Sequence, residues 1–234
     1  MSVIPNPLPK YPGSKGGSGV WQQIINQLPP HRVYIEPFLG SGEILRRKRP
    51  AEITIGLDID FNVVAAWESI GLGGCVLCGG ALEFLRGYNF VGDEFVYCDP
   101  PYLRQERSYK DRLYACEIWT VEQHAELLTI LVSLPCMVAI SGYWSLQYAG
   151  MLHSWRAISY NAPCHGRVAV EWLWMNYPEP RELHDYRYLG RDYRERELVS
   201  KMRRNLLGKL RGLDALRRYA MLAALEEFRG DQNL

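Results

Sequence analysis

Short apolar runs alternate with longer amphipathic segments over the first 160 residues of this chain. Between the runs lie helical segments, and Thr120 with Gln123 three residues later has the pattern of a capping box that begins a helix at 120–134. Alternation of this kind predicts an α/β fold, a Rossmann-like, mostly parallel sheet flanked by helices. The apolar runs that predict strands are residues 33–35, 53–57, 76–77, 95–98 and 137–140.

The pattern changes towards the end of the chain. A long run at 168–175 predicts a strand, with which residues 157–160 could pair, and Pro178-Glu179-Pro180 has the composition of a linker. From about residue 191 apolar positions recur four apart, which predicts a helix. Gly212 ends it and Asp214 can cap a second one. We therefore expect a main domain at 1–177 and a helical extension at 178–234 packed on it.

The composition is that of an ordinary globular protein, 47% hydrophobic and 23% charged over 234 residues. The sequence contains no apolar run of transmembrane length, and its first residues lack the pattern of a secretory signal, so a cytoplasmic location is expected. Cys75 and Cys78 form one C-x-x-C, without the second pair that a zinc site needs. We expect free thiols and no metal.

Although the net charge is only +1, the charged residues are distributed unevenly along the chain. Residues 187–218 hold eleven Lys or Arg against four Asp or Glu, a net charge of +7, and further basic clusters lie at 46–49 and 104–112. Any one such run is usually a solvated helix face. Three of them on a nearly neutral chain favour a nucleic-acid partner.

The most specific chemical signal is Asp99-Pro100-Pro101-Tyr102, directly after the predicted strand at 95–98. In open α/β sheets, ligands bind where strands end. Proline donates no backbone N–H, so nearby carbonyls stay available as acceptors. A carboxylate and a carbonyl can bind an exocyclic amine, and the tyrosine ring offers a surface for a base to stack on.

A glycine-containing loop, residues 36–42, follows the first predicted strand, where Gly40 and Gly42 permit a tight turn. A dinucleotide fingerprint would require a third glycine where Leu45 stands, so a dehydrogenase is disfavoured. Asp58 ends the second predicted strand, a position from which an acidic side chain can bind ribose hydroxyls, and Asp60 is the competing candidate.

In their order along the chain these motifs resemble the Dam-like family of DNA adenine-N6 methyltransferases. The resemblance covers residues 11–177, and the tail is similar to that of phage and prophage members. The segments that carry it are Tyr-Pro-Gly-Ser-Lys at 11–15, Glu-Pro-Phe-Leu-Gly-Ser-Gly at 36–42, Asp-Ile-Asp at 58–60, Asp-Pro-Pro-Tyr at 99–102, and the later strands at 138–143 and 171–177.

This resemblance implies a class I methyltransferase fold and S-adenosylmethionine as the methyl donor, with no metal. The catalytic residues it implies are Asp99, Pro100, Pro101 and Tyr102. Asp99 and the Pro100 carbonyl would accept hydrogen bonds from N6 of a flipped-out adenine, which Tyr102 would stack. Lys15 would lie near the donor's carboxylate, and Asp58 would bind its ribose. The donor-binding residues it implies are Tyr11, Lys15, Glu36, Pro37, Phe38, Gly40, Gly42, Asp58 and Asp99.

Two departures from the family pattern matter. Glycines at 79–80 stand where relatives often carry an Asp near the donor's adenine, and no recognition domain is inserted before Asp99. Recognition would then fall to residues 103–118 or to the basic tail, and we expect short or relaxed sequence specificity. The side chains predicted to contact DNA are Arg104, Arg107, Lys110, Arg203 and Arg204.

Three other functions stay open. A cytosine-N4 methyltransferase would usually carry Ser in place of Asp99. Methylation of adenine in RNA would use the same base pocket. A catalytically inactive DNA-binding module is disfavoured by the intact motif at 99–102.

Overall fold

The computed structural model describes Pro5, Pro7, Leu8 and residues 14–17, 19–71, 76–102, 119–164 and 167–231. Tyr11, Cys75 and the predicted recognition loop at 103–118 lie outside these residues, and with the loop so do Arg104, Arg107 and Lys110.

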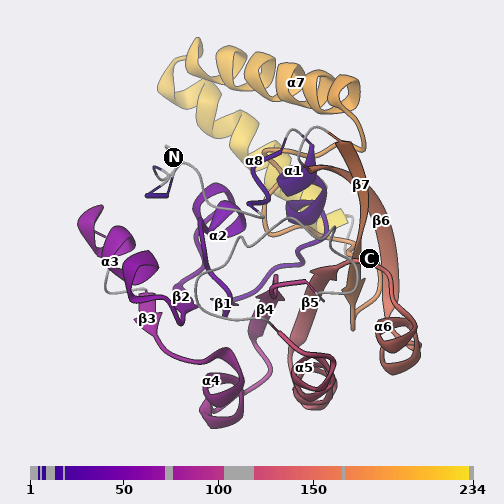
Figure 1. Ribbon diagram of the computed structural model, residues 1–234. Coiled ribbons are helices and arrows are strands. Elements are labelled where there is room, and N and C mark those ends of the chain that lie inside the picture. The colour runs from indigo at the N-terminus through magenta and orange to yellow at the C-terminus, as the bar shows by residue number, and fades with distance from the viewer. Residues whose placement is uncertain are drawn as a thin grey trace. The chain divides into compact units, whose positions relative to one another are not determined.

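One sheet of seven strands forms the main unit, in the order β3-β2-β1-β4-β5-β7-β6 (Figure 1). Strands β1 to β5 run parallel, whereas β7 lies antiparallel between β5 and β6. This arrangement confirms the predicted Rossmann-like, mostly parallel sheet flanked by helices. The strands are β1 (Val33–Glu36), β2 (Ile53–Asp58), β3 (Val76–Cys78), β4 (Glu94–Cys98), β5 (Met137–Gly142), β6 (Arg156–Cys164) and β7 (Arg167–Met175).

Helices cover both faces of the sheet. On one face, buried leucines of α4 and α5 and the Tyr148 ring of α6 pack on alternate residues of the central strands; α1 and α2 lie on the other (Figure 1). Helix α5 begins as predicted, with both hydrogen bonds of the Thr120–Gln123 capping box present. The helices of this unit are α1 (Val20–Ile25), α2 (Glu43–Arg47), α3 (Phe61–Ser69), α4 (Ala81–Gly87), α5 (Val121–Ser133) and α6 (Leu146–Met151).

The order of the strands creates a point where the chain reverses its direction across the sheet. From β1 the chain proceeds outward through β2 and β3, then returns to place β4 on the other side of β1. Because β1, β2 and β4 are parallel, the residues at their carboxyl ends, Glu36, Asp58 and Asp99, reach the same edge. Ligands of open α/β sheets bind at this reversal point.

The loop between β1 and α2 is fixed by its neighbours. The Trp67 indole donates to the Gly40 carbonyl at 2.9 Å, and Gly42 donates its N–H to the Leu39 carbonyl at 2.7 Å. Gly42 has a φ of +56°, in the left-handed region, and a Cβ there would overlap the indole carbons of Trp67. The tight turn therefore requires glycine at this position.

Gly42→Ala is expected to lower the free energy of unfolding by more than about 2 kcal/mol, since a left-handed conformation costs a residue with a Cβ about 1–2 kcal/mol before any overlap. The matched control is Gly150→Ala in α6, where a Cβ would meet nothing within 4 Å. This control should be neutral or stabilising. Urea unfolding measures both, and equal stability of the two variants would contradict the packing described.

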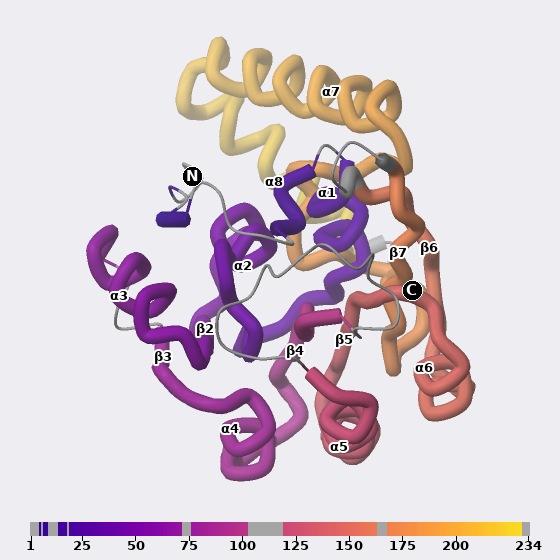
Figure 2. Tube along the Cα trace, in the orientation of Figure 1, coloured from indigo at the N-terminus to yellow at the C-terminus, as the bar shows by residue number. Residues whose placement is uncertain are grey.

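The C-terminal residues form a second compact unit, residues 187–234, after a first unit that ends at Tyr186. The boundary lies later in the chain than the predicted one, because His184 and Asp185 form hydrogen bonds with the main unit. His184 donates its backbone N–H to the Leu28 carbonyl, and Asp185 Oδ2 accepts the Arg49 N–H, both at 2.8 Å. The second unit contains α7 (Tyr193–Arg211) and α8 (Ala215–Asp231), coloured orange and yellow in Figure 2. Asp214 caps α8 through the Arg217 N–H, as predicted.

None of the helices in the described part of the chain has the length and apolarity needed to cross a membrane.

Candidate active site at the carboxyl edge of the sheet

A cavity of about 340 Å³ opens at the carboxyl edge, where the strand ends meet. This volume lies within the usual range for small-molecule sites. The loops after β1, β2, β3 and β4 all contribute to its wall, and Trp119 and Gln123 close it from the start of α5. Its polar lining is formed chiefly by Ser14, Lys15, Glu36, Asp58, Asp60 and Asp99.

Asp58 and the glycine loop face each other across the first part of this cavity. The Asp58 carboxylate accepts the Gly40 N–H at 2.8 Å on Oδ2 and the Asp60 N–H at 2.9 Å on Oδ1. Burial raises the pKa of Asp58, although these backbone hydrogen bonds act to lower it. Asp60 is instead the N-cap of α3, where it accepts the Asn62 N–H. Both carboxylates line the cavity.

Glu36 is a buried carboxyl group at the end of β1. Its Oε2 accepts the Tyr34 hydroxyl at 2.8 Å and the Leu45 N–H at 3.1 Å. Burial raises the pKa of Glu36 to about 8, helped by the nearby Asp99 charge and opposed by the Tyr34 hydrogen bond. A positive charge placed in the cavity would favour the ionised form.

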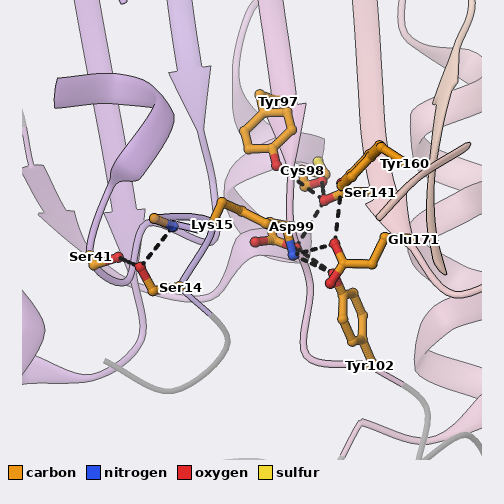
Figure 3. A network of polar contacts seen from close by, with 11 residues as sticks. Ser14, Lys15, Ser41, Tyr97, Cys98, Asp99, Tyr102, Ser141, Tyr160 and Glu171 are labelled. Atoms are coloured by element: carbon orange, nitrogen blue, oxygen red, sulfur yellow. Dashed lines mark hydrogen bonds and ion pairs between the residues drawn. The ribbon is translucent and has the colours of Figure 1, made fainter. Parts of the chain in front are cut away.

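Asp99 stands at the centre of a buried polar network, drawn in Figure 3. Its Oδ1 lies 2.8 Å from the Lys15 ammonium and accepts the Ser141 hydroxyl at 2.9 Å. The Tyr102 hydroxyl is 3.4 Å from the same oxygen. All contacts described for this carboxylate are made by Oδ1.

Lys15 bridges two carboxylates, since its ammonium also lies 3.1 Å from Glu171 Oε2 and contacts the Tyr102 hydroxyl. Its side chain is only 5% exposed. Burial acts to lower the pKa of Lys15, but the charges of Asp99 and Glu171 outweigh it and hold the pKa well above its usual value. Lys15 therefore stays charged inside the protein.

The segment 99–102 is held from behind by His124 of α5. Its Nε2 is 3.0 Å from the Pro101 carbonyl, and its Nδ1 is 2.9 Å from the Tyr148 hydroxyl. Burial lowers the pKa of His124 to about 4, so the ring is neutral at neutral pH. A neutral ring has one donor and one acceptor. Nε2–H then donates to Pro101, because a carbonyl can only accept, and Nδ1 accepts from Tyr148.

His124→Phe should lower the free energy of unfolding by about 1–3 kcal/mol, because it leaves a buried carbonyl and a buried hydroxyl without their partner. It should also displace the turn that carries Asp99. Tyr148→Phe is the matched control, since it removes only the hydroxyl and preserves the bond to Pro101. Thermal unfolding compares the two, and a variant His124→Phe as stable as the wild type would contradict this role.

The structure brings most of the predicted site residues together. Glu36, Asp58, Asp99 and Lys15 line one cavity with residues 37–42 and Pro101, and Tyr102 joins the network around Lys15. The resemblance implied that Lys15 lies near the donor's carboxylate; in the structure its ammonium forms an ion pair with Asp99. Gly79 and Gly80, the departure from the family pattern, also line the cavity.

Other predicted residues lie elsewhere. Arg203 and Arg204 are exposed on α7 in the second unit, where Arg204 pairs with Glu197 at 2.9 Å. Cys78, Cys98 and Cys136 are free thiols. Among the described residues, no group of three or more His, Cys, Asp or Glu is placed to hold a metal ion.

Sequence reasoning assigned no role to Glu171, Tyr160, Ser141 or His124. Glu171 had a visible signal, because an acidic residue interrupts the apolar run at 168–175. His124 had none, since one histidine on an amphipathic helix does not reveal what its ring contacts.

Comparisons with known proteins do not identify a family for this chain. No family model matches the chain, and neither does any curated protein. Among solved structures, magnesium protoporphyrin IX methyltransferase from Synechocystis, with bound SAM, is 12% identical with a TM-score of 0.44, covering 68% of this chain and 76% of that one. An rRNA methylase from Streptococcus thermophilus is also 12% identical, with a TM-score of 0.44 and coverage of 66% and 93%. Precorrin 8w decarboxylase from Methanobacterium thermoautotrophicum is 11% identical, with a TM-score of 0.43 and coverage of 71% and 92%. The function proposed below rests on this chain's own residues.

Proposed function

We propose that this protein is an S-adenosylmethionine-dependent methyltransferase that modifies N6 of adenine in DNA. The observation that carries the proposal is the convergence on one cavity of the glycine loop after β1, the carboxylate after β2 and, from the Asp-Pro-Pro-Tyr segment after β4, Asp99 and Pro101. These are the motifs on which the family resemblance rests, and the fold places them at the reversal point of the sheet.

The donor side of the cavity fits a nucleoside linked to an amino acid. Gly40 and Gly42 line the cavity and have no side chain, so the loop presents its backbone to a ligand there. Asp58 presents a carboxylate suited to ribose hydroxyls, and residues 36–42 would enclose the methionine part. S-adenosylmethionine would supply an electrophilic methyl group, because its sulfur is a sulfonium.

The acceptor side consists of groups that hold an amine. The lone pair of an adenine N6 amine is delocalised into the ring and is a poor nucleophile. Acceptors on its two hydrogens, Asp99 Oδ2 and the Pro100 carbonyl, would favour the pyramidal nitrogen and the positive charge that develop as the new bond forms. The Pro101 carbonyl is bound by His124, which leaves Pro100 as the predicted backbone acceptor.

DNA is proposed as the substrate because of the family motifs and the basic segments, with Arg104, Arg107, Lys110, Arg203 and Arg204 as phosphate or base contacts. Paired adenine hides N6, so the base must leave the duplex, and Tyr102 would stack it. Cytosine N4 and adenine in RNA are the competing acceptors. Labelled methyl transfer to DNA and RNA oligonucleotides, followed by chromatography of the nucleosides, separates all three.

Asp99→Asn should reduce kcat for methyl transfer by about 100- to 1000-fold, the scale of losing one preorganised group that stabilises transition-state charge. Asparagine preserves the shape of the side chain but cannot offer the negative charge. The measurement is single-turnover transfer of labelled methyl at saturating donor and DNA.

The matched control is Asp93→Asn, the same substitution on the loop before β4, where Asp93 pairs with Arg32 away from the cavity. It should leave kcat unchanged. Turnover of Asp99→Asn close to that of the control would refute the assigned role.

Binding of the sulfonium donor should strengthen as pH rises towards 8, because the Glu36 pKa is about 8 in the free protein and a nearby positive charge favours its carboxylate. Below pH 8 the binding of S-adenosylmethionine must then release a proton from Glu36. The affinity for S-adenosylmethionine therefore falls by up to about tenfold for each pH unit below 8. Isothermal titration at several pH values tests this.

Two comparisons isolate the effect. S-adenosylhomocysteine, which lacks the sulfonium charge, should show a flatter pH dependence than the donor. Glu36→Gln should flatten the donor's dependence as well. Equal pH profiles for the two ligands on the wild type would show that Glu36 is not coupled to the methyl donor's charge.

A further inference from the structure

We propose that Glu171 is a positioning residue for the amine acceptor: it shares Lys15 with Asp99, anchors the ammonium between the two carboxylates, and leaves the site with net negative charge. This inference rests on the proposed methyl transfer. It adds a residue from the antiparallel part of the sheet to a site otherwise built on parallel strands.

The position of Glu171 on β7 is unusual for a carboxylate. The pairing of β7 with β5 ends at the Gly142 and Trp172 pair, and Glu171 is the next residue beyond it, opposite Tyr160 of β6. Glu171 is 6% exposed. Its Oε2 accepts the Tyr160 hydroxyl at 3.2 Å and lies 3.1 Å from Lys15 (Figure 3). Removing an ionised carboxylate from water costs several kcal/mol, so one placed here calls for a function.

The second carboxylate changes the charge of the site. Lys15 and Asp99 alone would form a neutral ion pair. With Glu171 ionised, two negative groups face one positive group, and the three carry a net charge of −1. As the methyl carbon leaves sulfur and bonds to nitrogen, the electron pair of the broken bond stays on sulfur. The positive charge therefore moves to the amine, until the amine releases a proton to water. A net negative site stabilises that charge where it develops.

Glu171 also limits how far Lys15 can move. The Lys15 ammonium lies between the two carboxylates, 2.8 Å from Asp99 Oδ1, to which Ser141 also donates, and 3.1 Å from Glu171 Oε2. Without Glu171 the ammonium would have a single anionic partner and could move across both oxygens of Asp99. Anchored on Glu171, it stays beside Oδ1.

The pKa of Asp99 offers a readout that a purely structural role would not move. Burial raises this pKa, the Lys15 charge lowers it, and the Glu171 charge raises it. Removing the Glu171 charge should therefore lower the pKa of Asp99, and removing the Lys15 charge should raise it. Among the described residues, the titratable groups that interact with Asp99 are Lys15, Glu36, Tyr97, Cys98, Tyr102, Tyr148, Tyr160 and Glu171.

The test is Glu171→Gln, which preserves the shape of the side chain and an acceptor for Tyr160. We expect kcat to fall by about tenfold or more, with S-adenosylhomocysteine affinity within about twofold of the wild type. The acidic limb of the kcat profile should move to lower pH, because Asp99 ionises more easily. Lys15→Gln should move that limb to higher pH.

Two control variants separate charge from packing. Tyr160→Phe removes the hydroxyl that orients Glu171 without changing any charge, so it should lower kcat less and leave the acidic limb in place. Glu94→Gln neutralises a buried glutamate at the start of β4, which accepts the Val91 and Gly92 N–H groups. This variant should change the free energy of unfolding and leave kcat unchanged.

Carbon-13 NMR titration of the Asp99 carboxyl in the donor-free protein tests the inference separately from the activity. A lower midpoint in Glu171→Gln than in the wild type supports the proposal, even if no methyl transfer to DNA is found and the proposed function fails. An unchanged midpoint overturns it. The double variant Lys15→Gln/Glu171→Gln gives a second way to overturn it. If the fold-loss in kcat of the double variant equals the product of the two single fold-losses, the two residues act independently.

Discussion

The buried ammonium of Lys15 is the group on which the carboxyl edge of this sheet depends. Parallel strands deliver their carboxyl ends to one place, and here the antiparallel hairpin of β6 and β7 adds a further acidic residue beside Asp99. Two carboxylates in a low-dielectric environment repel each other and lose hydration. One cation placed between them makes their common burial tolerable, and Lys15 comes to this position from a segment that precedes α1.

The second requirement is a loop that stays close to the sheet without filling the cavity. Gly40 and Gly42 meet it because Trp67 of α3 fixes the carbonyl of one and excludes any side chain from the other. The loop can then donate the Gly40 N–H to Asp58, which joins the ends of β1 and β2 directly. This edge of the cavity is thus fixed by the packing of Trp67 and by the hydrogen bond between Gly40 and Asp58.

The two sides of the cavity handle charge differently. Beside the glycine loop, burial raises the pKa of Glu36 to about 8, so this carboxyl can respond to a cation that enters the cavity. Beside Asp99, the Lys15 ammonium contacts two carboxyl groups, those of Asp99 and Glu171. His124 supports the turn after β4 through a neutral ring, so the backbone of the turn is positioned without a further charge.

The sequence by itself determined the alternation of strands and helices, the capping box at Thr120, the cap at Asp214, and the residues that end β2 and β4. These follow from local patterns, because side-chain periodicity and capping depend on residues a few positions apart. The sequence did not reveal that Lys15 lies between Asp99 and Glu171, that His124 supports Pro101, or that His184 and Asp185 belong to the main unit. Those contacts join residues far apart along the chain. Only the packing of the sheet against its helices decides them, since a buried charge or ring takes whichever partner the fold brings within hydrogen-bond distance.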